Sequence, residues 1–177
     1  DILDADKAIA DAQKARAAGA DIVTVHIHAG TEYSTKINSD QKAFADKVTA
    51  SPDVDLVFGQ HAHVVQPIDR VNDKWVVYGA GNLIASSGPS KPWTYDGYVA
   101  QITFTEGPDG KFTASAAEYA PTFITRHSKS SPARVFVIPD ELSKGDSALA
   151  EQMRASAART RKVVHSHGVE GLTERGA

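Results

Sequence analysis

The chain has 177 residues and a formal net charge of −3 at pH 7. Hydrophobic residues make up 41% of it and charged residues 23%, which is typical of a folded globular protein and not of a disordered one. A mildly acidic chain lacks the concentrated basic surface that a phosphate backbone requires, so we expect no nucleic acid among its partners. The absence of cysteine excludes disulfides and thiolate metal sites.

Neither a membrane span nor a signal peptide is visible in the sequence, since no run approaches the roughly 18 apolar residues that a span needs. The chain begins at Asp1 instead of Met, at the approach to an expected helix. We therefore expect it to be a fragment or a processed product.

Helical and strand-like segments alternate near the start of the chain. Asp4 can cap the first helix and Ala18-Gly19 can end it. A strand, a helix and a second strand then follow within some 40 residues, which favours a parallel central sheet. The predicted elements are a helix over residues 4–18, a strand over 21–25, a helix from 38 or 39 to about 49, and a strand over 54–58.

The rest of the chain is expected to add an antiparallel layer. Gly107-Pro108-Asp109-Gly110 separates two alternating segments, the pattern of a β-hairpin. We expect two parts, a domain over residues 1–140 and a carboxyl-terminal helix with a flexible tail over 141–177. The predicted elements are a strand over 75–78, a surface loop over 86–92, hairpin strands over 99–105 and 111–119, a strand over 134–138, a helix over 143–164 and a frayed tail over 166–177.

Histidines follow two of the expected strands. His28 lies beyond the first strand, and Gly59 precedes the pair His61 and His63 beyond the second. In extended backbone, side chains two residues apart leave the same face, and neutral imidazole is the commonest protein ligand of transition metals. The pattern predicts a metal site. The alternative is exposed or hydrogen-bonded loop histidines, and His26 is either a partner of a ligand or a core histidine.

Three further polar or aromatic residues near these histidines are candidates for the site. Glu32 is a metal ligand, a carboxylate that orients one, an acid–base group, or a solvated loop residue. Tyr33 either donates to a substrate oxyanion or packs as an aromatic ring. Asn82 follows the third strand and either presents its amide to the cleft or satisfies a turn. His127, His165 and His167 are expected to be solvated.

Three linked motifs resemble a known family. His28-x-Gly-x-Glu-Tyr33, Gly59-x-His-x-His-Val-Val-Gln-Pro67 and Tyr78-Gly-Ala-Gly-Asn82 are similar, in order and spacing, to the signatures of CapA-type proteins. This is the capsule-synthesis, poly-γ-glutamate family of the calcineurin-like metallophosphoesterase superfamily. The resemblance runs from about residue 4 to 119. It implies an α/β fold, the carboxyl-terminal half of a four-layer α/β/β/α metallophosphoesterase-like sandwich.

The resemblance also implies a site for divalent metal ions (Mn, Fe or Zn), two of them in the complete protein. Such ions polarise a phosphate and lower the pKa of a bridging water. The superfamily's amino-terminal motifs, Asp-x-His, Gly-Asp and Asn-His, do not precede His28 in this chain, so the site is only partial. Ala29 stands where Trp is usual, which implies a more open cleft wall. The predicted site residues are Glu32 and His61 for catalysis, Tyr33 and Asn82 for substrate binding, and His28, His61 and His63 as metal ligands.

The predicted function is that of a CapA-like protein of poly-γ-glutamate, capsule or envelope-polymer biosynthesis, with a metal-dependent phosphoesterase-like site that this chain completes only in part. The alternative is a non-catalytic scaffold or polymer-binding subunit of a capsule machine. A third reading keeps the sheet without any ligand. Expected partners are a phosphorylated or polyglutamate-type substrate, the amino-terminal half of the parent protein and membrane-bound capsule-synthesis subunits. The resemblance implies a cell-envelope location, membrane-associated or secreted.

Overall fold

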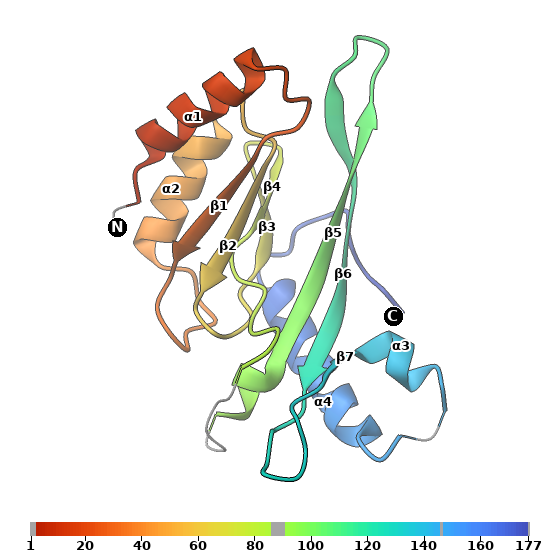
Figure 1. Ribbon diagram of the computed structural model, residues 1–177. Coiled ribbons are helices and arrows are strands. Elements are labelled where there is room, and N and C mark those ends of the chain that lie inside the picture. Colours follow the sequence, from red (N-terminus) through yellow and green to blue (C-terminus); the bar gives the residue numbers. More distant parts are fainter. Residues whose placement is uncertain (1–2, 86–90, 146, 177) are drawn as a thin grey trace.

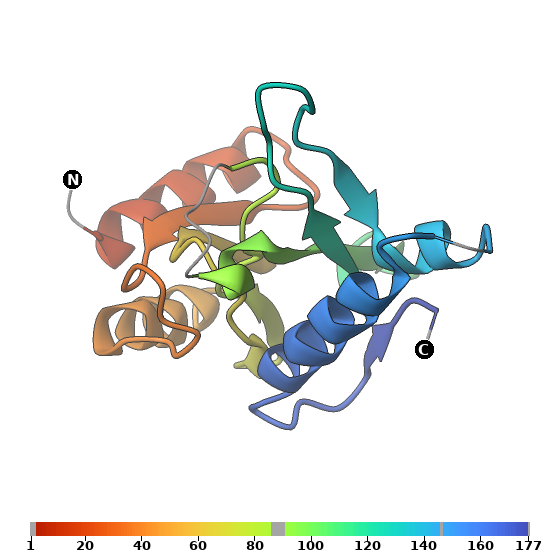
Figure 2. The same cartoon turned by 90° about the horizontal axis from the view of Figure 1, so that it is seen from below.

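Two β-sheets face each other in the computed structural model, which describes residues 3–85, 91–145 and 147–176 (Figure 1). The first sheet has the strand order β1-β2-β4-β3, and the second has the order β5-β6-β7 with β8 paired to β6. Both helices and β-strands are therefore present, which confirms the predicted α/β class. Figure 2 shows α1 and α2 at one side of the molecule and α4 at the other.

The first sheet forms from the amino-terminal part of the chain. β1, β2 and β4 run parallel to one another, and β3 is antiparallel to β4. This confirms the parallel strand–helix–strand unit that the sequence predicts; β3 is an addition. The elements are α1 (Ala5–Ala17), β1 (Thr24–Ala29), α2 (Ser39–Thr49), β2 (Leu56–His61), β3 (Ile68–Val71) and β4 (Lys74–Val77).

Both amino-terminal helices begin at side-chain caps. The Asp4 carboxylate accepts a hydrogen bond from the Lys7 backbone N–H at 2.9 Å, as its sequence position predicts. Asn38 and Gln41 form a capping box, in which each side chain accepts from the backbone N–H of the other. The second helix therefore starts after Asn38, one of the two predicted positions.

The two histidine-bearing strands extend further toward the carboxyl end than predicted. β1 covers Thr24–Ala29 instead of residues 21–25, and β2 covers Leu56–His61 instead of 54–58. Parallel pairing continues to the Ala29–His61 register, so the backbone ladder includes the polar residues His28 and Gln60. The sequence pattern missed this because it followed apolar side chains, whereas the ladder is made by the backbone.

The second sheet contains the predicted hairpin. β5 and β6 are antiparallel and longer than expected, and the far end of the pair projects beyond the body of the molecule (Figure 1). Of the predicted surface loop, residues 86–90 lie outside the described part of the chain. The elements are the 3₁₀ helix η1 (Pro92–Tyr95), β5 (Asp96–Glu106), β6 (Phe112–Ile124), β7 (Val135–Val137), α3 (Ile138–Leu142), α4 (Ala150–Val164) and β8 (Leu172–Glu174).

The carboxyl-terminal segment corrects the prediction of a frayed, flexible tail. Its strand β8 pairs in parallel with β6, and the Glu174 carboxylate accepts bonds from the Tyr119 hydroxyl at 2.6 Å and from Arg161 at 2.7 Å. The predicted helix over 143–164 is also shorter, since α4 begins at Ala150. The boundary between residues 140 and 141 stays a prediction.

Two apolar clusters hold the first sheet in place. One lies between this sheet and the helices α1 and α2 and includes Phe44, Val48 and Val57. The other joins the two sheets and includes Trp75 and Tyr119. No helix in the described part of the chain has the length and apolar character that spanning a membrane requires.

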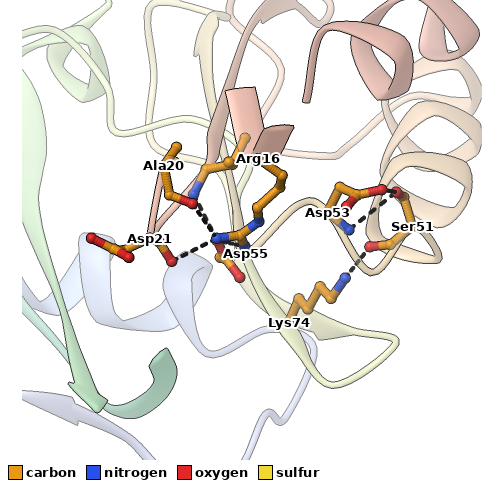
Figure 3. A network of polar contacts seen from close by, with 8 residues as sticks. Arg16, Ala20, Asp21, Ser51, Asp53, Asp55 and Lys74 are labelled. Carbon is orange, nitrogen blue, oxygen red and sulfur yellow. Dashed lines mark hydrogen bonds and ion pairs between the residues drawn. The ribbon is translucent and has the colours of Figure 1, made fainter. Parts of the chain in front are cut away.

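A polar network fastens α1 to the amino end of the sheet (Figure 3). The Arg16 guanidinium donates to the Asp55 carboxylate and to the carbonyls of Ala20 and Asp21. The same carboxylate accepts from the Val23 N–H at 2.6 Å, just before β1. The network therefore fixes the ends of β1 and β2 that lie opposite the histidines.

Candidate functional site

His28 and His61 meet at the carboxyl ends of two neighbouring strands. Because β1 and β2 are parallel and in register from Thr24 to Ala29, both side chains emerge at one edge of the sheet. His61 Nδ1 lies 3.0 Å from His28 Nε2, and the ring centroids are 4.7 Å apart in an edge-on arrangement. At this distance one imidazole donates its N–H to the other, so the two ring nitrogens point at each other.

The chain turns sharply after β2, whereas the His-x-His spacing predicted extended backbone there. His61 has φ of 120° and His63 has φ of 58°, both in the region that non-glycine residues rarely occupy. Tyr33, on the facing loop, also has a positive φ of 63°. The His61 and His63 rings still lie near each other, with centroids 6.5 Å apart. A turn, and not strand alternation, brings them together.

Asn82 fixes the orientation of His63. Its amide nitrogen donates to the carbonyls of His63 at 3.2 Å and Thr94 at 3.0 Å, so its oxygen is the atom that faces His63 Nδ1 at 2.9 Å. An oxygen only accepts, so Nδ1 carries a proton, and in the neutral imidazole Nε2 keeps its lone pair. Both amide hydrogens are used within the protein. This geometry favours the local structural role left open for Asn82 over contact with a substrate.

Tyr33 packs against the site and does not point freely into it. Its ring stacks on His63 with a centroid distance of 6.2 Å, and its N–H donates to the Ala62 carbonyl at 2.7 Å. The Lys91 ammonium lies 3.4 Å from the Tyr33 ring centroid, a cation–π contact. Tyr33 therefore joins a cation to the histidine cluster. Its predicted contact with substrate stays a prediction.

Two adjoining pockets border the histidines. His28, His61, His63 and Asn82 all line one of about 410 Å³, whose rim includes the exposed side chains of Leu83 and Ile84. His28 and His61 also line a neighbouring pocket of about 680 Å³, together with Asp4, Asp6 and Asp40. Glu32 is exposed and lines neither pocket, so the structure does not bring it to the histidines.

The predicted metal ligands can be described by the arrangement of the donor atoms in the structure. Within residues 3–85, 91–145 and 147–176, no group of three or more His, Asp or Glu side chains is arranged to hold a metal ion. The nitrogens of His28 and His61 nevertheless converge, and His63 offers a free nitrogen in the same pocket. The metal roles of the three histidines stay predictions.

Gln66 and Gly59, both inside the quoted motifs, have roles that sequence reasoning missed. Gln66 is fully buried; its amide donates to the carbonyls of Ser34 and Lys36 and accepts from Gln41 at 2.8 Å, which ties the Tyr33 loop to α2. The sequence contained one signal for this role, because Gln66 is a polar residue that follows the apolar pair Val64-Val65. Gly59 lies within β2, and a Cβ there would lie 2.2 Å from the Tyr78 carbonyl oxygen.

Fold and site together define an α/β protein with a histidine-lined pocket at the carboxyl edge of a parallel sheet. Residues 2–87 match the family model described as bacterial capsule synthesis protein PGA_cap. The PGA biosynthesis protein CapA of Bacillus subtilis (strain 168) is 31% identical over 93 residues, which cover 52% of this chain and 24% of that protein. The capsule biosynthesis protein CapA of Bacillus anthracis is 33% identical over 88 residues, 50% of this chain and 20% of that protein.

These matches confirm the resemblance of the amino-terminal half of the chain, residues 2–87, to the CapA-type capsule-synthesis family. All three histidines and Asn82 lie within the matched residues. The matched stretch spans a quarter or less of the length of these two relatives.

Proposed function

We propose that this chain supplies part of a divalent-metal site in a phosphoesterase-like protein of capsule biosynthesis. The observation that carries the proposal is the 3.0 Å separation of His28 Nε2 and His61 Nδ1. Two nitrogens bound to one ion at about 2.0–2.1 Å, with angles between octahedral and tetrahedral, lie about 2.9–3.4 Å apart. The two imidazoles therefore already have the spacing of neighbouring ligands on a single ion.

His63 adds a third donor nitrogen near this pair. Its Nδ1–H is held by Asn82, which is how a ligating histidine is commonly fixed, and its Nε2 is free to bind an ion or a substrate oxygen. Mn, Fe and Zn all accept imidazole together with oxygen ligands. Bound there, such ions polarise a phosphate oxygen and generate hydroxide from water. Asn82 acts as a positioning residue in this arrangement.

The remaining ligands are proposed to come from a further segment of the complete protein. In the described part of the chain β1 pairs with β2 alone, so the strand that carries His28 is the edge of its sheet. β5 is likewise an edge of the second sheet. Strands added at these edges would extend the two sheets into the four-layer α/β/β/α sandwich and bring more donors to His28.

The substrate and partners are proposed from the family. We expect a phosphorylated or polyglutamate-type substrate, with Glu32 and His61 as catalytic groups and Tyr33 at the substrate. The names of the two relatives, which refer to PGA and capsule biosynthesis, favour association with the cell envelope. Membrane-bound capsule-synthesis subunits are proposed as partners from the family resemblance alone. Glu32 would have to move toward the histidines on substrate binding, because it lines neither of the pockets that border them.

Metal titration of the chain tests the paired-histidine site directly. Mn²⁺ or Zn²⁺ is titrated into the protein and binding is followed by calorimetry and by the histidine NMR signals. We expect His28→Ala and His61→Ala each to weaken binding at least tenfold. The matched control is His26→Ala, because His26 lies on the same strand, contacts Phe58 and does not line the 410 Å³ pocket.

Metal affinity that is equal in the wild type and in both variants would contradict the site. The catalytic step is tested separately in the full-length parent protein with p-nitrophenyl phosphate, where His61→Ala is expected to abolish metal-dependent hydrolysis. Polyglutamate binding that survives removal of all three histidines, without such hydrolysis, would favour the scaffold alternative.

A further inference from the structure

A separate pocket of about 580 Å³ lies where the first sheet's loops meet the end of α4. None of the three site histidines lines it. We call it the α4 pocket. Residues 35–37 and 65–67 contribute one wall, and α4 with the residues that follow it contributes the other. Its volume falls in the range of small-molecule sites, about 300–1,000 Å³, and such sites are frequent where two structural units meet.

The inner surface of the α4 pocket is mainly apolar. Ile37, Val65, Pro67 and Val163 provide aliphatic surface, and the indole of Trp93 stands at the edge with 38% of its surface exposed. A half-exposed indole beside aliphatic side chains gains free energy when a ligand covers it. The apolar walls therefore favour a ligand with a hydrocarbon or aromatic body.

The charged groups of the α4 pocket are positive in sum. The Asp96 carboxylate is fully buried and already accepts from the Ser156 hydroxyl and from Arg159 Nε and Nη2, each at 2.7 Å, so its charge is compensated. Lys36 and Lys162 also line the pocket, and neither has an ion-pair partner in the described part of the chain. Two uncompensated ammonium groups remain beside apolar walls.

We propose that the α4 pocket binds an amphipathic anion, a molecule with a compact carboxylate or phosphate head and an apolar body. The head pairs with Lys36 and Lys162, with the hydroxyls of Thr35 and Ser166 as further donors. The body lies against Val65, Val163 and Trp93. This site does not depend on the metal site proposed above, because none of His28, His61 and His63 lines the α4 pocket.

Trp93 provides the measurement, since the other tryptophan, Trp75, is only 3% exposed and is shielded from a ligand in this pocket. Octanoate is titrated below its micelle concentration while tryptophan emission is recorded. We expect a blue shift and saturable binding. Acetate, which lacks the body, and octylammonium, which has the opposite charge, are expected to bind at least tenfold more weakly. Trp93→Phe should remove the signal while calorimetry still detects binding.

Charge reversal locates the site. Lys36→Glu with Lys162→Glu is expected to weaken octanoate binding at least tenfold. Lys129→Glu is the control, because Lys129 is exposed and does not line the pocket. Circular dichroism of each variant reports on the fold, and Lys162→Arg, which keeps the charge, should bind like the wild type.

Three outcomes would overturn the proposal. Equal binding of octanoate and octylammonium would remove the role of the lysines, and unchanged binding in the doubly reversed variant would place the ligand elsewhere. Binding to vesicles containing phosphatidylglycerol without any binding of monomeric octanoate would indicate a lipid surface in place of an enclosed ligand. The His28→Ala variant, which is expected to lose metal binding, should still bind octanoate like the wild type. The two proposals can therefore be tested separately.

Discussion

The amide of Asn82 determines which nitrogen of His63 is available for chemistry. Asn82 Oδ1 lies 2.9 Å from His63 Nδ1, while the amide nitrogen is held by the carbonyls of His63 and Thr94. Neither the amide nor the imidazole can reverse its role without leaving a buried polar group unpaired. His63 is therefore held in one tautomer before any ion or substrate arrives.

Replacing Asn82 tests this relationship without any metal. In the wild type, ¹⁵N NMR of the histidine rings should show His63 protonated at Nδ1. Asn82→Ala should shift its population toward the Nε2–H form and cost about 1–3 kcal/mol of unfolding free energy, because the carbonyls of His63 and Thr94 lose their donor.

Asn82→Asp is the matched variant, since the carboxylate keeps the acceptor for His63 Nδ1–H and loses both donors. It should retain the wild-type tautomer while losing stability. A His63 tautomer that is unchanged in Asn82→Ala would show that Asn82 does not control it.

Gly59 is expected to be intolerant of any side chain. A Cβ at this position would lie 2.2 Å from the Tyr78 carbonyl oxygen and 3.2 Å from that of Val77, both backbone atoms next to β2. Gly59→Ala should therefore push β2 and β4 apart and cost about 3 kcal/mol or more, measured by urea unfolding.

Gly110→Ala is the control for Gly59. Gly110 has a φ of 75°, but in the described part of the chain no atom beyond its sequence neighbours lies within 4 Å of the position that a Cβ would take. The substitution should cost only about 1 kcal/mol, the price of a left-handed backbone. Equal effects of the two substitutions would show that close contact between the strands does not explain Gly59.

The pairing of Arg16 with Asp55 is expected to stabilise the first sheet. The Asp55 side chain is only 14% exposed and accepts from Arg16 (Figure 3). It also accepts from the Val23 N–H. Asp55→Asn keeps an acceptor but removes the charge, which should cost about 1–3 kcal/mol in urea unfolding.

Asp46→Asn breaks a pair on the surface with Lys42, whose side chain is 64% exposed, and it should leave the unfolding midpoint unchanged. An Asp55→Asn protein as stable as the wild type would mean that solvation of the separated charges is as favourable as their pairing.

The sequence predicts the first half of the fold well because its signals are local. The Asp4 and Asn38 caps and the alternation of strands and helices identify α1, α2 and the parallel pair β1–β2. β8 has no such signal. It is three residues long, and the contacts of Glu174 with Tyr119 and Arg161 join positions 55 and 13 residues apart in the chain.

The sequence selects several residues of the pocket but not its geometry, and one predicted site residue, Glu32, lines neither pocket. Motif spacing selects His28, His61, His63 and Asn82, and all four line one pocket. The turn that places His63 near His61 depends on positive φ angles that an alternating strand pattern does not contain. The role of Gln66 was not predicted, because its amide donates to backbone carbonyls of a loop, and every residue has such a carbonyl whatever the sequence.

The attachment of β8 is expected to weaken in acid. Burial alone would raise the pKa of Glu174, but the hydrogen bonds from Arg161 and Tyr119 outweigh it and hold this pKa below its ordinary value of 4.5. As the pH falls, the unfolded carboxyl takes up its proton before the folded one. The stabilisation from Glu174 is therefore complete above about pH 5 and is lost as the pH falls through the folded pKa.

Hydrogen exchange of the β8 amides, compared at pH 6 and pH 3 after correction for the intrinsic rate, measures this attachment. Protection in the wild type should fall at least tenfold more than that of the β1–β2 ladder. Glu174→Gln should have low β8 protection at both pH values, because a neutral amide cannot replace the charged pairing with Arg161. Glu170→Gln, an exposed position in the same segment, should behave like the wild type. Since Tyr119 and Arg161 both hold the one carboxylate, β8 protection that does not change with pH would mean that its backbone pairing with β6 is sufficient by itself.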